Sequence, residues 1–331
     1  MENKITAAIA GVGAYVPDYR LTNKELETMV ETNDEWITSR TGIKERRILK
    51  EKDAGTSFMA IRAAKTLLEK HDIDPRTIDL LIVATATPDV QAASTAVYTA
   101  TKIGAINAFA FDLDAACSSF LYGMSVAAKY IESGRYKRVL LIGADKCSSM
   151  IDYTDRATCI IFGDGAGAVL FEPNREGLGI QDEYLRGDGN GREYLNVKSG
   201  GSSRPFTAET LDNREHYVKQ DGRTVFKNAV SMMASAVETI LDRNQLTTDH
   251  VHWLAAHQAN KRIIDATANR VGIPEEKTLV NIEKYGNTTS ATLPLLLWDF
   301  EKELKKGDKI IFATFGGGFT WGSIYLTWAY G

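Results

Sequence analysis

Three side chains in this 331-residue chain suit acyl transfer, and the first of them is Cys117. It separates the strand-like run "NAFAFDLDA" from apolar residues at helical spacing, so a helix is predicted to begin at or just after it. The unpaired amides and positive dipole end of a helix start lower the pKa of a thiol, and we expect that effect here. Free cysteine is also among the most buried residue types, so filling the core is the structural alternative.

His257 and Asn287 could serve such a thiol as a base or as hydrogen-bond donors. His257 comes just after the apolar strand "HWLAA", at the kind of strand end where open α/β sheets bind ligands. Asn287, in "KYGNTTSATLP", precedes a second predicted helix. Each has a structural alternative, because histidine at a strand end is often structural and asparagine is favoured as a helix cap and in turns.

Glycine runs follow two other apolar strands. In "TFGGGFTWGS", residues 314–323, the missing Cβ atoms would let backbone amides approach a ligand closely, with a sterically required turn as the alternative. The other stretch, "IIFGDGAGAV", has the spacing GxGxG and leads into a strand-like run, so we do not expect it to bind a dinucleotide.

The elements that must position these residues occur twice, about 170 residues apart. Segments 67–85 and 240–257 both read as a helix end, a turn and a buried strand. Segments 135–145 and 305–315 both lead from a basic helix end into an apolar strand. The repeat indicates that the chain contains two similar halves.

Cys117 and Asn287 occupy matching positions in this repeat, each between a predicted strand and a helix. We therefore expect one half at residues 1–175, with the cysteine, and the other at 176–331, with the histidine and asparagine. Alternating apolar strands and amphipathic helices predict an α/β fold with mostly parallel strands covered by helices on both faces. Two stacked halves would form a layered α-β-α-β-α sandwich. A pattern common to all α/β proteins is the alternative explanation of the repeat.

The composition favours a soluble globular protein, with 44% hydrophobic and 25% charged residues. Its longest apolar runs are too short to span a bilayer, and Glu2 stands where a secretory signal would be basic, so we expect no membrane association. A net charge of -4 argues against a general nucleic-acid binder. The three cysteines, with Cys147 and Cys159 interpreted as core or loop residues, suggest neither a disulfide framework nor a zinc site and favour the cytoplasm.

Several longer motifs resemble one family over nearly the whole chain. In order they are "NDEWITSRTGI", "DLDAACSSF", "DRATCIIFGDGAGAV", "HQAN", "YGNTTSAT" and "FGGGFTWGS". The chain resembles β-ketoacyl-acyl carrier protein synthase III, the condensing enzyme that starts type II fatty-acid synthesis, within the thiolase-like superfamily. The resemblance implies a duplicated thiolase-like fold, acyl-CoA and malonyl-acyl carrier protein as substrates, and a homodimer. We expect no metal or redox cofactor, since a thiol, an imidazole and an amide suffice for the implied chemistry.

The resemblance also implies roles for individual residues. Cys117 would accept the acyl group, His257 and Asn287 would bind the malonyl thioester and promote decarboxylation, and the amides of Cys117 and Gly317 would form the oxyanion hole. The implied CoA contacts are Trp36 and Arg156 at the adenine, Arg40 at the phosphates, and Gly222 and Asn260 at the pantetheine arm. The implied acyl pocket includes Phe162 and Phe315, the second of which would shield the reaction centre. It also includes Ala92, which the resemblance implies would reach the pocket from the neighbouring subunit of a homodimer.

The carrier of this family is a small acidic protein, so an acidic chain needs a local basic patch to bind it. Arg223 and Lys227, four apart at a predicted helix start, and Lys261 with Arg262, just beyond the histidine, could form that patch. Ordinary solvated surface charge is the alternative.

Two features depart from the family pattern. Many members have "FPS" after the "TPD" turn, whereas Ala92 and Ala93 stand there in this chain, which predicts that starters longer or bulkier than acetyl are accepted. The segment 193–220 is longer than expected and reads as a surface loop or flap without an assigned role.

Three other functions remain open from the sequence. The order Cys, His, Asn is also that of papain-like cysteine proteases, although the duplication and the mid-chain cysteine speak against them. A condensing enzyme of specialised metabolism, with another starter or acceptor, would share the motifs. A non-catalytic partner subunit would keep the fold, but it would not need an intact Cys, His and Asn.

Overall fold

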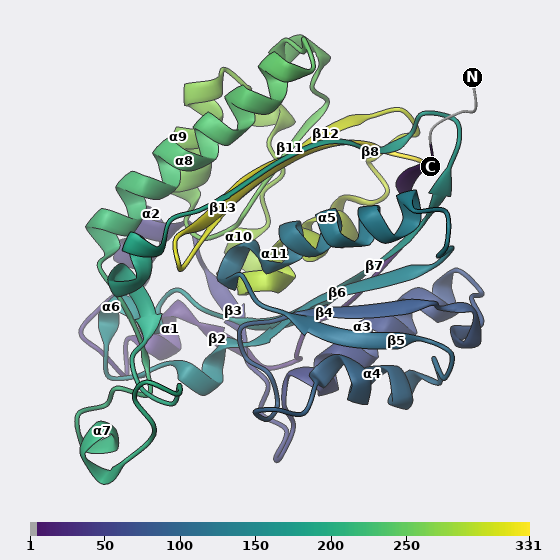
Figure 1. Cartoon of the computed structure of the whole chain (residues 1–331). Coiled ribbons are helices and arrows are strands. Elements are labelled where there is room, and N and C mark those ends of the chain that lie inside the picture. Colours follow the sequence, from purple (N-terminus) through teal and green to yellow (C-terminus); the bar gives the residue numbers. More distant parts are fainter. Residues whose placement is uncertain (1–4) are drawn as a thin grey trace.

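The computed structural model describes residues 5–331, and two β-sheets form its framework (Figure 1). The strands of the first sheet, in spatial order, are β1 (Thr6–Tyr15), β7 (Asp164–Asn174), β6 (Val139–Lys146), β4 (Leu80–Ala84) and β5 (Phe109–Leu113). Those of the second are β11 (Trp253–Ala256), β12 (Lys309–Gly316), β13 (Thr320–Thr327) and β8 (Gly179–Gly187). The inner strands β4, β6 and β12 are mainly apolar because both of their faces are buried.

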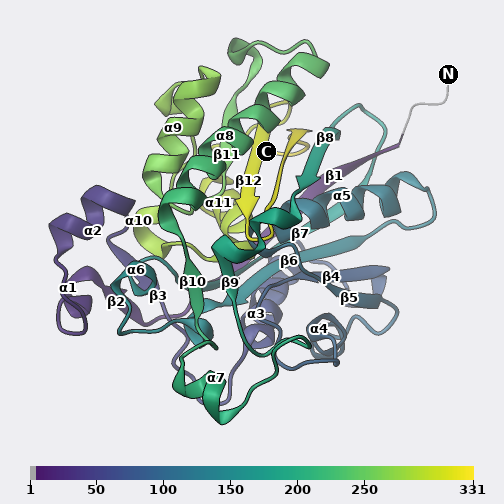
Figure 2. The same ribbon diagram turned by 60° about the vertical axis from the view of Figure 1, so that its left-hand side comes forward.

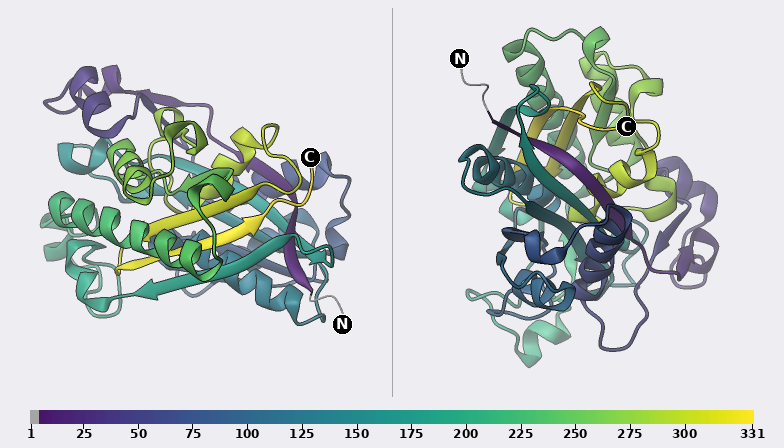
Figure 3. Two further views of the ribbon diagram at one scale, coloured as in Figure 1. Left: turned by 90° about the horizontal axis from the view of Figure 1, so that it is seen from above. Right: turned by 90° about the vertical axis from the view of Figure 1, so that its right-hand side faces the viewer.

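Helices cover both faces of each sheet, which gives five layers (Figures 1 and 3). The layer between the sheets contains α5 (Ser119–Glu132) and α11 (Thr292–Phe300). The outer face of the first sheet packs against α3 (Thr56–Lys70) and α4 (Thr95–Ile103), and that of the second against α8 (Gly222–Arg243) and α9 (Lys261–Val271). The predicted α-β-α-β-α sandwich is confirmed.

Shorter elements lie at the ends of the strands, beside and below the sheets in Figure 2. The strands and α-helices among them are β2 (Arg20–Thr22), α1 (Asn23–Leu26), α2 (Asp34–Thr41), β3 (Glu45–Arg47), α6 (Arg156–Cys159), β9 (Leu195–Val197), α7 (Ala208–Asp212), β10 (Val218–Gln220) and α10 (Ile282–Tyr285). The 3-10 helices are η1 (Pro75–Thr77), η2 (Ala116–Ser118), η3 (Cys147–Met150), η4 (Gly189–Tyr194), η5 (Thr248–His250), η6 (Glu275–Lys277) and η7 (Thr289–Ala291).

Matching elements account for the repeat in the sequence. The order α3, η1, β4 in the first sheet's part of the chain is repeated as α8, η5, β11 in the second's. Helix α5 follows η2 directly, as α11 follows η7. The first sheet ends at Asn174 and the second begins at Gly179, so a boundary at 175/176 would fall in the turn between them; the division into two domains stays a prediction.

The prediction of mostly parallel strands is wrong, because both sheets are mixed. Strands β6, β4 and β5 are parallel, whereas β7 is antiparallel to both β6 and β1. Strands β11 and β12 are parallel, whereas β13 is antiparallel to both β12 and β8. Only residues 317–319 connect β12 to β13, and a parallel pair needs a far longer crossover.

The two middle helices are buried between the inner faces of both sheets. Phe120, Leu121 and Met124 of α5 pack with Leu296 of α11 and with strand residues such as Phe312. This packing holds the starts of both helices at the centre of the molecule, and Cys117 and Asn287 lie just before those starts. Within residues 5–331, no helix combines the length and apolar character needed to cross a membrane.

Candidate active site

Cys117 lies in η2, immediately before α5, as the sequence predicted. The chain turns sharply there: Ala116 has φ +50°, and its N–H donates to Asp114 Oδ1 at 2.8 Å. Ser119 Oγ accepts from the Ala115 N–H at 2.7 Å, which secures the turn from the helix side. Only 8% of Cys117 is exposed, and the residue borders two cavities.

The pKa of the Cys117 thiol is raised to about 12, opposite to the lowering expected from a helix start. Burial is the largest cause, and the negative charge of Asp145 adds to it. A hydrogen bond from the Asn287 side chain opposes the rise without cancelling it, and Asp114 raises the pKa further. The thiol, not the thiolate, is therefore the resting form. Cys147 and Cys159 are buried and free, in agreement with their interpretation as core residues.

His257 follows β11, where its backbone N–H donates to the Ala313 carbonyl at 2.8 Å and extends the pairing with β12. Its side chain is buried, and burial lowers its pKa to about 3, so the imidazole is neutral. Neither ring nitrogen has a hydrogen-bond partner among residues 5–331. A buried imidazole with both nitrogens free is positioned to bind a polar group of a substrate.

Asn287 is held by its own backbone and by its side-chain oxygen. Its N–H donates to the Ile161 carbonyl at 2.9 Å, and its carbonyl accepts from Gly163 at 3.0 Å, which fixes it beside Phe162. Its Oδ1 accepts from the Thr289 N–H at 2.9 Å. Because the oxygen is occupied in this way, the amide NH₂ group is left to face the Cys117 thiol.

The glycine run passes directly over the Cys117 turn. A Cβ on Gly316 would lie 2.8 Å from the backbone nitrogen of Cys117 and 3.0 Å from that of Ser118, closer than side-chain atoms approach. Thr320 Oγ1 donates to the Ala115 carbonyl at 2.8 Å, which ties the end of the run to the same turn. This close approach requires glycine and brings Gly317 next to Cys117.

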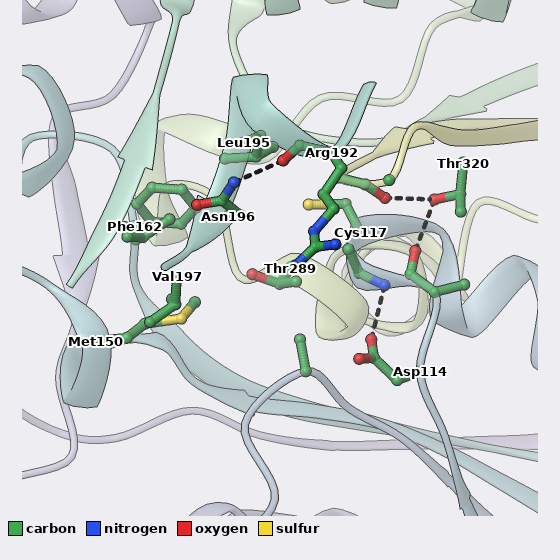
Figure 4. Close-up of a pocket in the computed structure, with 16 residues that line it drawn as sticks. Asp114, Cys117, Met150, Phe162, Arg192, Leu195, Asn196, Val197, Thr289 and Thr320 are labelled. Carbon is green, nitrogen blue, oxygen red and sulfur yellow. Dashed lines mark hydrogen bonds between the residues drawn. The ribbon is translucent and has the colours of Figure 1, made fainter. Parts of the chain in front are cut away.

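Two cavities meet at Cys117, Phe162 and Leu195. The larger, of about 480 Å³, is bordered mainly by small and apolar side chains (Figure 4). Besides the shared residues these include Ala86, Met150, Val197, Val218 and Thr289. The smaller, of about 130 Å³, runs past His257, Asn287 and Phe315 to the starts of α8 and α9, where Gly222 and Asn260 border it. The three reactive side chains therefore share one space that leads to the surface.

Of the residues expected to contact CoA, Gly222 and Asn260 border the smaller cavity. The Arg156 guanidinium stacks over the Trp36 ring, 4.9 Å from its centroid. Asn260 caps α9 through its side-chain oxygen, while its Nδ2 donates to the Arg40 carbonyl at 3.0 Å. The hydrogen bond joins α2 to the start of α9.

The four cations expected to bind a carrier lie on the neighbouring helices α8 and α9. Arg223, Lys227 and Arg262 are exposed, and the Arg262 guanidinium lies 5.4 Å from the centroid of the Phe226 ring. Lys261 differs, because its Nζ is 2.8 Å from Asp265 Oδ1 and its charge is already neutralised.

Ala92 and part of the segment 193–220 lie outside the two cavities. Ala92 is exposed, has φ +70°, and is not among the described residues that border either cavity. Segment 193–220 is partly wall and partly surface: β9 and β10 pair antiparallel beside the cavities, and only the excursion at 198–217 between them lies outside.

Two residues near the site were not predicted. Arg192 borders the larger cavity with its guanidinium, close to Cys117 in Figure 4. Gln258, in "HQAN", is buried and uses both ends of its amide: Nε2 donates to the Ala256 carbonyl at 2.9 Å, and Oε1 accepts from the Asn281 N–H at 3.1 Å. Gln258 belongs to the motif "HQAN", but its hydrogen bond to Asn281 joins segments more than twenty residues apart, which the sequence does not reveal.

Comparisons with known proteins agree with this geometry. The family models described as 3-oxoacyl-[acyl-carrier-protein (ACP)] synthase III and its C-terminal part match residues 111–189 and 241–328. The chain is 57% identical over 327 residues to β-ketoacyl-[acyl-carrier-protein] synthase III 2 of Bacteroides thetaiotaomicron, covering 99% of this chain and 98% of the relative.

Solved structures give the same result. A 3-oxoacyl-[acyl-carrier-protein] synthase III from Aquifex aeolicus has a TM-score of 0.90 at 40% identity, over 97% of this chain and 100% of that chain. The priming β-ketosynthase of a polyketide pathway also has a TM-score of 0.90, at 32% identity, over 99% of this chain and 98% of that one. The higher identity to fatty-acid enzymes does not favour a specialised pathway. The chain belongs to the β-ketoacyl-[acyl-carrier-protein] synthase III family of condensing acyltransferases, which initiate fatty-acid synthesis.

Proposed function

We propose that Cys117, His257 and Asn287 carry out the two half-reactions of this enzyme on acyl-CoA and malonyl-acyl carrier protein. The observation that carries the proposal is that a thiol, a neutral imidazole with two free nitrogens and an oriented amide border one cavity. Such a set can accept an acyl group and then stabilise an enolate, without a metal or redox cofactor.

In the first half-reaction, the Cys117 sulfur attacks the thioester carbonyl of acyl-CoA. A bond from sulfur to the acyl carbon forms, the bond to the CoA sulfur breaks, and the thiol proton leaves with CoA. Because the resting thiol holds its proton, a base must assist, and the neutral His257 imidazole in the same cavity can accept it. The amides of Cys117 and Gly317, brought together by the glycine run, donate to the oxyanion.

In the second half-reaction, the malonyl group loses carbon dioxide and its enolate attacks the acyl-Cys117 carbonyl. Negative charge develops on the malonyl thioester oxygen, where His257 and the Asn287 amide can both donate hydrogen bonds. Acylation of Cys117 removes the thiol that Asn287 contacts in the resting enzyme, so its NH₂ group becomes free for this oxygen. Carbon–carbon bond formation then expels the Cys117 sulfur as a thiolate, which takes a proton from solvent.

The proposal extends to the surroundings of the site. The pantetheine arm passes Gly222 and Asn260 in the smaller cavity, with the nucleotide at Trp36, Arg156 and Arg40 outside it. The acyl chain occupies the larger cavity beside Phe162, with Phe315 shielding the centre. A carrier docks on the exposed cations of α8 and α9. We further propose a cytoplasmic homodimer, in keeping with three free buried cysteines.

The test separates the two half-reactions. Incubation with acyl-CoAs and peptide mass spectrometry should place a thioester on Cys117 and not on Cys147 or Cys159, and Cys117→Ala should abolish condensation. Asn287→Ala should still be acylated but should lose decarboxylation of the malonyl carrier, whereas His257→Ala should be acylated more slowly and should also lose decarboxylation. Acylation of another cysteine, or condensation by Cys117→Ala, would show that the assignment is wrong.

A further inference from the structure

Asp145, near the end of β6, is a carboxylate with no exposed surface and no role in the steps above. Its Oδ1 accepts three hydrogen bonds, from Thr85 Oγ1 at 3.0 Å, the Ala86 N–H at 2.8 Å and Thr87 Oγ1 at 2.8 Å. Its Oδ2 accepts two, from the Ser290 N–H at 2.9 Å and from Ser290 Oγ. No lysine, arginine or histidine within residues 5–331 forms an ion pair with it.

The two oxygens of Asp145 bind two different parts of the active site. Oδ1 holds the residues that follow β4, including Ala86 at the wall of the larger cavity. Oδ2 holds η7, which belongs to the other half of the repeat. The backbone of η7 lies directly on β6, since a Cβ on Gly143 would come within 2.2 Å of the Ser290 carbonyl oxygen. One side chain therefore clamps β4 and η7 onto the same strand.

The hydrogen bonds from Ser290 to Asp145 also affect Asn287, because the neighbouring residue Thr289 donates its N–H to Asn287 Oδ1. Ser290 follows Thr289, whose φ of +51° is unfavourable for a β-branched residue and must be held by its surroundings. Thr289 contacts Cys147 Sγ through Oγ1 at 3.0 Å, and its N–H orients the Asn287 amide. Without the bonds to Ser290, the turn that directs the Asn287 NH₂ group towards Cys117 would lose its two hydrogen bonds to β6.

We propose that Asp145 is a positioning residue, which holds η7 against β6 so that Asn287 presents its NH₂ group to the reaction centre. The inference rests on the proposed role of Asn287 in decarboxylation. A buried carboxylate suits this task because it accepts from all five donors at once, whereas a neutral amide offers one oxygen and two competing N–H groups.

The negative charge of Asp145 also disfavours ionisation of the Cys117 thiol. Asp145 raises the pKa of the thiol, together with burial and with Asp114, while Asn287 lowers it and His257 in the same cavity is neutral. Burial raises the pKa of the Cys147 thiol on η3, and the charges of Asp145 and of Asp164 on β7 raise it further. Removing the Asp145 charge should therefore have effects of opposite sign on thiol reactivity and on decarboxylation, which loss of packing alone would not produce.

The experiment measures both effects in Asp145→Asn. Alkylation of Cys117 by iodoacetamide, followed by peptide mass spectrometry between about pH 7 and pH 10, should be severalfold faster at each pH than in the wild type. Decarboxylation of malonyl-acyl carrier protein should fall by about tenfold or more, because a small displacement of a catalytic donor is costly. Wild-type decarboxylation would overturn the proposal.

Three further variants keep the outcome interpretable. Ser290→Ala leaves the charge in place, so decarboxylation should fall without faster alkylation; wild-type decarboxylation here would also overturn the proposal, even if Asp145→Asn failed to fold. Asp164→Asn is the matched control, a buried carboxylate that accepts from Leu49 and Ser148, and it should change neither rate at Cys117. If Asn287→Ala decarboxylates malonyl-acyl carrier protein normally, the proposed function of Asn287 is wrong. If Asn287→Ala loses decarboxylation but the Asp145 and Ser290 variants keep it, only the positioning role of Asp145 is wrong.

Discussion

Arg214 and Asp152 form a double hydrogen bond that ties the surface excursion at 198–217 to the loop before α6. Asp152 is buried and Arg214 holds the pKa of its carboxyl far below the usual range. Thr154, on the same loop, donates to Asp152 through both its N–H and its hydroxyl. At the other end of the excursion, Gln91 Nε2 donates to the Gly200 carbonyl at 2.9 Å. The excursion thus connects the loop before α6, the helix that begins at Arg156, with the loop that carries Ala92.

Replacing Arg214 should weaken CoA binding without affecting acyl transfer itself. Arg214→Ala leaves the Asp152 carboxylate buried and unpaired, so the loop that positions Arg156 against Trp36 should shift. We expect the KM for acyl-CoA to rise severalfold. Acylation by a short thioester that lacks the nucleotide should stay unchanged, and acylation kinetics with the two donors measure the difference.

Arg204→Ala provides the control for this prediction. Arg204 bonds to Glu215 within the excursion and does not reach the loop of Asp152. Its replacement should leave the KM for acyl-CoA close to that of the wild type. Equal losses with both thioesters, or in both variants, would mean that the excursion stabilises the whole site and not the CoA end.

The resting thiol should show the pH dependence of a buried cysteine. With a pKa of about 12, roughly one Cys117 in ten thousand is a thiolate at pH 8, and alkylation should rise about tenfold per pH unit up to pH 10. His257, with a pKa of about 3, stays neutral throughout and should add no inflection near pH 6.5. Iodoacetamide kinetics, with Cys117→Ser to subtract Cys147 and Cys159, measure the profile. A plateau near neutral pH would instead indicate a thiolate paired with a histidine cation.

Much of the site could be predicted because its residues stand at element ends. Cys117 follows β5 and His257 follows β11, and chain ends of neighbouring elements converge in layered α/β folds. The strand predicted before Asn287 is wrong, because the short helix α10 precedes that residue. The helix after Cys117 was predicted from apolar residues that recur no more than four positions apart, which is a local signal. The repeat supplied the layer order, since two similar halves must bury the same helix faces.

What could not be predicted depends on contacts between distant segments. The pKa of Cys117 is set by burial under the glycine run and by Asp145, neither of which is near it in sequence. Arg192 reaches the larger cavity from η4, and β9 forms a wall that the composition of 193–220 concealed. Strand direction was mispredicted because burial on both faces looks the same for parallel and antiparallel strands.

Gly316→Ala should slow acylation strongly while leaving the fold intact. Its Cβ would meet the backbone nitrogen of Cys117 at 2.8 Å, so the run or the Cys117 turn must move and the proposed oxyanion hole must open. A loss of about a hundredfold in acylation rate is expected. Gly201→Ala, where a Cβ would meet nothing within 4 Å, is the control and should behave as wild type. An active Gly316→Ala enzyme would exclude a role for this close approach.

Reversing the exposed charges on α8 and α9 should impair only the step that uses the carrier. Lys227→Glu with Arg262→Glu should raise the KM for malonyl-acyl carrier protein by about fivefold or more, and added salt should weaken the wild type in the same way. Acylation by acyl-CoA should be nearly unchanged. Lys65→Glu, on α3 in the opposite outer layer, is the control for net charge. If acylation and condensation fall together, the carrier docks elsewhere or the variant is misfolded.

Starter length should respond to the size of the side chain at position 92. The larger cavity, of about 480 Å³, has room for more than an acetyl group, and small Ala92 would leave that space open if it reaches the cavity of a neighbouring subunit as the family implies. Each extra buried methylene contributes about 0.8 kcal/mol, so two or three of them shift preference by more than about tenfold. Ala92→Phe should therefore restrict the enzyme to short starters, whereas Ala92→Ser should not, in kcat/KM measurements with acetyl-, isobutyryl- and octanoyl-CoA. A wild type confined to acetyl-CoA, with Ala92→Phe unchanged, would show that another side chain sets the limit.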